Sequence, residues 1–207
     1  MNEITAITPQ ITDKRRCNVY VDGRFCCGLT LEATVKNRLK VGQIITPDRL
    51  AEIQLESEKN TAFDKALTHL SATQKTEKQV RAFLEGKGYL SAVIEYVVEK
   101  LHSYNFLNDG QYAESYVEFA GKRKGSRLIR MELKGKGISD ENIEAAIEGL
   151  TAEQEMETAS AQLEKYMRGK PCDKPTLQKA YRYLMGKGYD YEVIKSALTA
   201  YGECEDE

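Results

Sequence analysis

The sequence predicts a mainly α-helical protein, in which tandem three-helix repeats form an elongated, curved array behind a small N-terminal β-hairpin and helix. Three observations support this fold class. A Leu-x-Gly-Lys-Gly pattern recurs three times, apolar residues around each copy recur at helical spacing, and an Asp-Gly pair separates two β-prone runs near the start. Together they predict four segments: an N-terminal extension at 1–58 and three-helix units at 59–108, 109–151 and 152–207.

The N-terminal hairpin is predicted from the pair Asp22-Gly23, which lies between two β-prone runs. A two-residue type I′ turn needs φ > 0 at both central positions, and this pair of residue types tolerates it. We therefore expect strands near 17–21 and 24–29. An isolated hairpin is marginal in water, so we expect it to pack on the next helix or on the body of the chain.

Two helices are expected after the hairpin. Thr30 opens a short helix that ends near Lys40, and residues 41–45 add a short strand or a turn. Thr46 is then a suitable N-cap and Pro47 a suitable first residue for the next helix, because proline lacks the N–H that is unsatisfied there.

The recurring pattern marks the end of the second helix in each repeat. Its Gly-Lys-Gly part lies at 86–88, 135–137 and 186–188, so the intervals are 49 and 51 residues. A helix often ends at a residue in the left-handed region, which glycine enters without a Cβ clash. The predicted second helices span 76–85, 126–134 and 174–185. The N-caps of the third helices are expected at Leu90 or Ser91, at Ser139 and at Asp190.

Apolar side chains at helical spacing predict the helix faces that pack in each repeat. The first helices carry i, i+4, i+7 faces at Phe63, Leu67 and Leu70, and at Tyr112, Tyr116 and Phe119. The third helix of the first unit carries an apolar stripe at Val93, Ile94, Val97, Val98 and Leu101. Equivalent positions of the second helices are apolar as well: Val80, Ile129 and Ala180.

Composition excludes several classes of protein. The 207 residues carry 30 Lys and Arg against 32 Asp and Glu, a formal net charge of −2. No apolar run is long enough to span a membrane, and the first residues lack the pattern of a secretory signal. The five cysteines lack Cys-x-x-Cys spacing, which argues against a disulfide framework and a zinc site. We expect a cytoplasmic protein with reduced cysteines that act as small apolar residues: Cys17, Cys26, Cys27, Cys172 and Cys204.

Enzymatic chemistry has no visible basis in the sequence. The two histidines, His69 and His102, are far apart on helical stretches, where surface or packing roles are usual. No carboxylates have the spacing of metal ligands, and the Gly-Lys-Gly segments lack the pattern of a phosphate-binding P-loop. We therefore expect a protein that is not an enzyme and needs neither a metal nor a cofactor.

Charge is strongly segregated in the middle of the chain, from the second unit into the third. Residues 120–137 carry seven basic side chains against one acidic side chain, Glu132, so their formal charge is +6. Residues 138–164 carry eight acidic side chains and no basic one, a formal charge of −8. The chain ends with four more acids among residues 203–207. The small net charge therefore conceals a basic stretch beside an acidic one.

Two interpretations of the basic stretch remain open. Arg127, Arg130 and Lys134 lie at i, i+3 and i+7, and with the preceding basic residues they could bind a phosphate backbone or an acidic protein surface. Alternatively, they are ordinary solvated charges, partly paired with the acids of the next helix or of the third unit. The nearby acids weaken affinity for free nucleic acid, which favours a protein partner or a protein–nucleic acid assembly.

Two further features have competing interpretations. The helix–Gly-Lys-Gly–helix junction resembles a helix-turn-helix, but the third helix of the second unit is acidic, which disfavours entry into a major groove. Tyrosines could stack on bases, yet at helical spacing they more often pack between helices. The tyrosines concerned are Tyr89, Tyr96, Tyr104, Tyr112, Tyr116, Tyr166, Tyr181, Tyr183, Tyr189 and Tyr191.

The middle of the chain resembles the bacterial RecX family, whose members regulate the RecA recombinase. The motifs are Phe-Leu-Asn-Asp within 104–113, a glycine-containing basic loop followed by Ile-x-x-Glu-Leu within 122–133, and Lys-Gly-Ile within 136–139. The resemblance covers roughly residues 60–200 and includes the tandem three-helix units; the hairpin region supports it more loosely.

The resemblance implies a non-enzymatic protein of DNA repair, homologous recombination and the SOS response. Such a protein binds in the groove of the RecA filament on single-stranded DNA and limits filament extension, strand exchange, ATP hydrolysis and coprotease activity. We expect a monomer with at most weak, non-specific DNA binding. The implied filament contacts are Lys122, Arg123, Lys124, Arg127, Arg130, Lys134, Lys136, Arg81 and Lys87. A helical-repeat scaffold or a helix-turn-helix protein with another partner remains the alternative.

Overall fold

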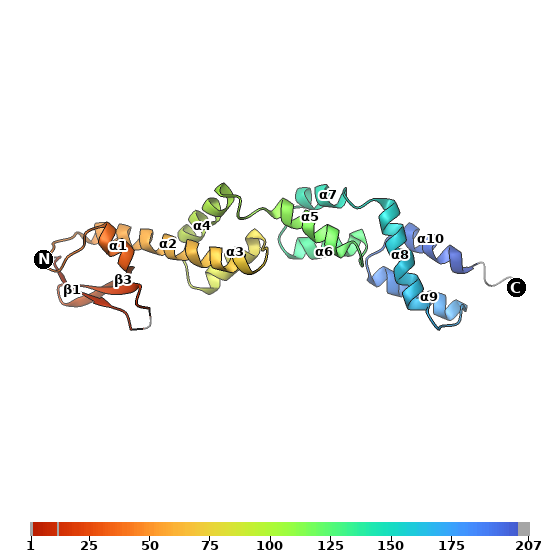
Figure 1. The fold of residues 1–207 in the computed structure, drawn as a ribbon, viewed down its shortest axis with the longest axis horizontal. Helices are drawn as coiled ribbons and strands as arrows, with labels where there is room; N and C mark the ends of the chain where they lie inside the picture. The colour runs from red at the N-terminus through yellow and green to blue at the C-terminus, as the bar shows by residue number, and fades with distance from the viewer. Residues whose placement is uncertain (1, 12, 203–207) are drawn as a thin grey trace. The chain divides into compact units, whose positions relative to one another are not determined.

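The computed structural model describes residues 2–11 and 13–202, with side chains up to Thr199. This part of the chain forms three strands and ten helices (Figure 1). The chain divides into two compact units: Met1–Gln74 with Gln79–Leu107, and Lys75–Lys78 with Asn108–Glu207. Cys204 and the four acids of the C-terminal segment lie outside the described residues. The expected elongated, curved shape and the four segment boundaries stay predictions.

The described elements follow the order that the sequence predicts, with one strand added at the start. The strands are β1 (Ile4–Pro9), β2 (Arg16–Val21) and β3 (Arg24–Thr30). The first helices are α1 (Leu31–Lys36), α2 (Pro47–Ala72), α3 (Glu77–Gly86) and α4 (Ser91–Ser103). The remaining helices are α5 (Asp109–Ala120), α6 (Ser126–Gly135), α7 (Asp140–Ile147), α8 (Ala152–Met167), α9 (Lys174–Gly186) and α10 (Tyr191–Gly202).

The strands form one antiparallel sheet in the order β1-β2-β3. The predicted hairpin is confirmed: Asp22 and Gly23 have φ values of 47° and 77°, as a type I′ turn requires. Strand β1 was not predicted. It completes a sheet whose inner face contributes Ile4, Val19 and Leu29, each 0% exposed, to the first hydrophobic core.

One predicted helix boundary needs correction. Helix α1 ends at Lys36 rather than near Lys40, because Asn37 caps it and Arg38 adopts a left-handed φ of 51°. Residues 41–45 form a turn with a single β-bridge at Ile44. Helix α2 begins at the predicted cap, where the Thr46 side chain accepts a hydrogen bond from the Arg49 N–H, but it continues unbroken to Ala72.

Three three-helix domains follow the predicted repeats. We call the C-terminal part of α2 with α3 and α4 the first domain, α5–α7 the second domain and α8–α10 the third domain. Each has its own hydrophobic core, and the aligned residues Val80, Ile129 and Ala180 are all 0% exposed. The leucine that precedes each Gly-Lys-Gly is also fully buried: Leu84, Leu133 and Leu184.

One predicted packing residue is wrong. Phe119 is 72% exposed, whereas Ala113, Val117 and Ala120 form the buried face of α5. Tyr112 and Tyr116 pack at the margin of that core, as expected. The aromatic residue was therefore assigned to the wrong side of the helix, because small residues that fill the core give a weaker periodic signal.

The tyrosines and cysteines mostly take the expected packing roles. Tyr189 is 1% exposed, and Tyr104 and Tyr191 are each 57% exposed; the other tyrosines named above are half-buried. Cys17 and Cys27 are buried thiols of the first core, and Cys26 is exposed. Burial and the neighbouring Cys26 raise the pKa of Cys27 to about 12.

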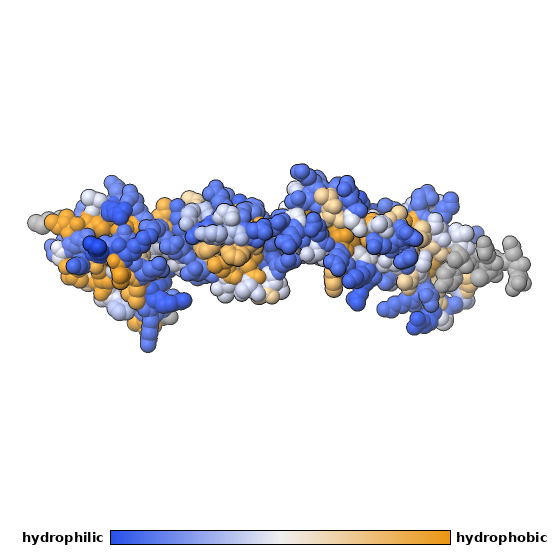
Figure 2. All heavy atoms as spheres, turned by 45° about the horizontal axis from the view of Figure 1, so that its top comes forward, coloured by the Kyte–Doolittle hydropathy of each residue, from blue (hydrophilic) through white to orange (hydrophobic). Residues whose placement is uncertain are grey.

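The described surface is mainly hydrophilic in the view of Figure 2, with apolar side chains visible between the charged ones. None of the described helices is both long and apolar enough to cross a membrane. Within the same residues, no group of three or more His, Cys, Asp or Glu side chains has the arrangement of a metal site.

Candidate functional site

The basic loop, residues 121–125, connects α5 and α6 in the second domain and is fastened to the third domain. The Gly125 N–H donates to the Lys187 carbonyl at 3.0 Å, and the Arg127 N–H donates to the Gly188 carbonyl at 3.2 Å. The Ser126 N–H donates to the Glu155 carboxylate at 2.7 Å. These bonds use N–H groups at the start of α6 that have no partner within their own helix. The third domain therefore fixes where the basic loop lies.

Glycine is required on both sides of this junction. A Cβ on Gly125 would collide with the Gly188 carbonyl, and a Cβ on Gly188 would collide with Leu128. Gly188 also has a left-handed φ of 87°. The last Gly-Lys-Gly segment thus ends α9 and also allows the backbones of two domains to touch.

Glu132 anchors the basic loop from within the second domain. Its carboxylate accepts hydrogen bonds from Lys124 Nζ at 2.6 and 2.7 Å and from the Tyr116 hydroxyl at 2.6 Å. Burial acts to raise the pKa of Glu132, but the hydrogen bonds from Lys124 and Tyr116 outweigh it and hold the pKa below its usual value. Burial and the bond to Glu132 raise the pKa of Tyr116 to about 12. This network fixes Lys124 in place and partly neutralises it.

Two of the predicted contact residues on α6 are paired with the acidic helix α7. Arg130 donates two hydrogen bonds to Glu144, at 2.9 and 3.0 Å, and Lys134 donates to Asp140 at 3.0 Å. The hydrogen bond to Glu144 is the main reason why the pKa of Arg130 is raised further. On this face of α6, Arg130 and Lys134 are therefore paired with the acids of the next helix, as the second interpretation of the basic stretch expected.

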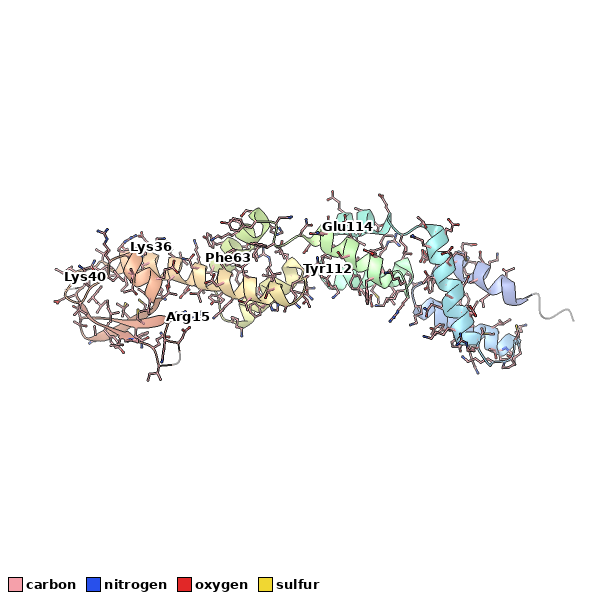
Figure 3. All side chains as sticks on the ribbon, viewed as in Figure 1. Arg15, Lys36, Lys40, Phe63, Tyr112 and Glu114 are labelled. Atoms are coloured by element: carbon pink, nitrogen blue, oxygen red, sulfur yellow. The ribbon has the colours of Figure 1, made fainter. Side chains whose placement is uncertain are left out.

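Three exposed cations of the predicted patch lie in the basic loop and in the first turn of α6. Lys122, Arg123 and Arg127 are exposed, and within the described residues none of them forms an ion pair. Lys136 is half-buried, with its Nζ 5.7 Å from the ring centroid of Tyr112 (labelled on α5 in Figure 3) and 5.5 Å from that of Tyr116. Among the described residues, only part of the predicted basic patch therefore consists of cations without an ion pair.

Arg81 and Lys87 belong to the first domain. Arg81 donates two hydrogen bonds to Glu95, at 2.6 and 3.0 Å, and the Arg130–Glu144 pair repeats this arrangement in the second domain. Lys87 is exposed, with its Nζ 5.6 Å from the Phe83 ring centroid. Sequence reasoning missed the anchoring roles of Glu132 and Glu155. The aligned Arg and Glu positions of the first two repeats were a signal that could have revealed the ion pairs.

Four family models match the chain in order. They are described as the Regulatory protein RecX N-terminal domain, at residues 2–46, and as the first, second and third three-helix domains of RecX, at residues 62–101, 108–147 and 153–198. The order and type of these matches agree with the sheet and the three helical domains described above.

Curated relatives match over nearly the whole chain. Regulatory protein RecX of Clostridium perfringens (strain 13 / Type A) is 34% identical over 202 residues, which cover 96% of this chain and 95% of the relative. Regulatory protein RecX of Bacillus velezensis is 32% identical over 199 residues, or 94% of this chain and 76% of the relative.

Solved structures of RecX proteins are also similar to this chain. A crystal structure of regulatory protein RecX has a TM-score of 0.71 and 26% identity, covering 94% of this chain and 98% of the other. The crystal structure of RecX from Lactobacillus salivarius has a TM-score of 0.66 and 27% identity, covering 70% of this chain and 97% of the other. The chain belongs to the RecX family of regulatory proteins.

Proposed function

We propose that this protein is a non-enzymatic, monomeric, cytoplasmic regulator of the RecA recombinase. It binds in the groove of the RecA filament on single-stranded DNA and inhibits filament extension, strand exchange, ATP hydrolysis and coprotease activity. Membership of a family of regulatory proteins supports the regulatory role. The contact is made by the basic loop and the first turn of α6, where Lys122, Arg123 and Arg127 are exposed and form no ion pair with any residue that the structure describes.

One observation carries this assignment: the exposed cations of the basic loop lie on a backbone segment that is held in place from two sides. Glu132 holds the loop from one side, and the turn between α9 and α10 holds it from the other. The free cations are therefore presented at a defined position, so less conformational entropy is lost when they meet phosphates or carboxylates. Several weak contacts along a repetitive filament then reinforce one another through effective concentration.

The paired cations play a smaller part in this proposal. Arg130 and Lys134 already face carboxylates of α7, and a partner would have to compete with these. The exposed acids Asp140, Glu141 and Glu144 on α7 also disfavour a classical helix-turn-helix contact with a DNA major groove. Any binding to free DNA should be weak, strongly dependent on salt and insensitive to sequence.

The direct test adds the purified protein to preformed RecA filaments on single-stranded DNA and follows ATP hydrolysis. We expect the hydrolysis rate to fall at protein concentrations well below that of RecA, because blocking extension lets filaments shorten. Random duplex DNA at physiological salt serves as the control for simple DNA binding. An unchanged rate at stoichiometric protein would contradict the proposed function. Tight binding to one specific duplex would support the helix-turn-helix alternative instead.

A further inference from the structure

The third domain carries an open groove between α9 and α10. No residue of the basic loop lines it. The groove has a volume of about 610 Å³, and its floor includes Leu177 and Leu198, which are partly buried. Tyr181 and Tyr191 also line it. We call it the α9–α10 groove.

The repeat explains why the groove is open. Alignment on the Gly-Lys-Gly segments makes Arg81, Arg130 and Tyr181 equivalent, and likewise Glu95, Glu144 and Lys195. In the first two domains the arginine and the glutamate form a doubly hydrogen-bonded ion pair that links the second and third helices. In the third domain the arginine is replaced by an aromatic residue and the glutamate by a lysine. The bridge is therefore absent, and a carboxylate has become a cation.

The second ion pair of this face is missing in the same way. Lys134 and Asp140, which pair in the second domain, correspond to Met185 and Tyr191 in the third domain. Both carboxylates that neutralise this face of the second domain have thus been lost from the third domain. The change affects the surface alone, since the aligned core residues of the two domains are buried alike.

The charged side chains that line the groove are all basic. Three cations line it, Lys174, Arg182 and Lys195, and no carboxylate does. Within the described residues none of the three forms an ion pair. Asp173, which directly precedes Lys174, is the N-cap of α9 and accepts a hydrogen bond from the Thr176 N–H at 2.8 Å. The groove therefore complements a negatively charged partner.

The groove suits an acidic protein segment better than a nucleic acid strand. Its floor includes two leucines, which offer contacts to aliphatic side chains and none to phosphates. Base stacking would need open aromatic faces, but the Nζ of Lys195 lies over the Tyr191 ring, 6.0 Å from its centroid. Tyr181 packs partly into the core of the third domain.

We propose that the α9–α10 groove is a second binding site, which takes an acidic protein segment carrying leucine-like apolar side chains. The apolar side chains enter between α9 and α10, and the carboxylates meet Arg182, Lys195 and Lys174. This site is separate from the basic loop, so the proposal stands or falls independently of the proposed contact with the RecA filament.

The test uses a fluorescein-labelled peptide of about twelve residues in which Glu and Leu alternate in pairs, titrated with the full chain and followed by anisotropy. R182E/K195E should weaken binding by about tenfold or more, because two charge-assisted contacts become repulsive. K179E is the matched control. It reverses a charge on an exposed residue of α9 that does not line the groove, so it should weaken binding by less than about twofold.

A graft tests the explanation drawn from the repeat. Y181R/K195E restores the Arg–Glu pair of the other two domains, so peptide binding should fall by about tenfold while circular dichroism shows a folded chain. A peptide with Gln in place of Glu should bind about tenfold more weakly as well. In amide spectra of the labelled full chain, the shifts caused by the peptide should fall on α9 and α10.

Four results would overturn the proposal. Shifts confined to the basic loop would place the peptide elsewhere. Equal losses for R182E/K195E and K179E would indicate non-specific attraction. Tighter binding of a dT oligonucleotide of the same length would make the groove a nucleic-acid site. Peptide binding only to a chain that ends at Gly202 would show that the groove holds the chain's own acidic end.

Discussion

The second and third domains share a core but differ in surface charge. Leu133 and Leu184 are both 0% exposed, and Ile143 and Ile194 are nearly so. On the face formed by the second and third helices, however, Arg130 pairs with Glu144 in one domain, whereas Tyr181 and Lys195 occupy the aligned positions in the other. The comparison teaches that the repeat preserves the residues that fold each domain and changes the charged residues on its surface.

The largest expected effect tests whether the two cores are equivalent. L133A and L184A each remove a fully buried leucine and should lower the free energy of unfolding by about 2–5 kcal/mol. Urea unfolding followed by circular dichroism measures both. A cost below about 1 kcal/mol in one domain only would show that the cores are not equivalent.

The second prediction concerns the junction between these domains. G188A places a Cβ against Leu128 at a left-handed φ and should cost about 3 kcal/mol. G169A is the control, because Gly169 has a φ of 73° but no atom within 4 Å of the added Cβ, and it should cost about 1 kcal/mol. Equal losses in urea unfolding would mean that the close contact between the two domains is not formed.

The third prediction concerns pH and the second domain alone. The native pKa of Glu132 is depressed, so its contribution to stability is present above its ordinary value of 4.5 and is lost as pH falls through the lower native value. The urea midpoint of the wild type should therefore fall more steeply than that of E132Q over this acid range. E141Q, at an exposed glutamate of α7, controls for net charge and should follow the wild type. Parallel curves for the wild type and E132Q would contradict the anchoring role of Glu132.

The smallest effect is expected when the surface of the third domain is moved onto the second. R130Y/E144K replaces an exposed ion pair, and pairs of this kind contribute little to stability. We expect no resolvable change in the urea midpoint. A large loss would make the Arg–Glu pair a structural requirement, and the third domain would then need a replacement for it.

Most of the fold could be predicted from the sequence, and local signals explain why. The Asp22-Gly23 turn, the Thr46 cap and the three Gly-Lys-Gly helix ends each depend on residues adjacent in the chain. Strand β1 was missed because its pairing with β2 is a tertiary property of a short, weakly patterned segment. Phe119 was misplaced because the face that α5 buries is chosen by the helices packed against it.

The candidate site was harder to predict, because charge pairing depends on helix packing. The basic stretch was visible as a run of lysines and arginines, but the sequence left open which of them pair with α7. Arg130 and Lys134 do so, and Lys124 pairs within its own domain with Glu132. The anchoring of the basic loop by Glu155 and by the turn at Gly188 connects residues too distant in sequence for any local pattern.

The most direct test of the central claim is inhibition of RecA-driven ATP hydrolysis by K122E/R123E/R127E. These three side chains are exposed and form no ion pair within the described part of the chain. Their reversal should therefore leave the urea midpoint unchanged and raise the protein concentration needed for half-inhibition by about tenfold or more. K14E/R24E/K40E reverses three exposed charges near the N-terminal sheet and should raise it by less than about twofold. Inhibition by the first variant as strong as that of the wild type would contradict the account.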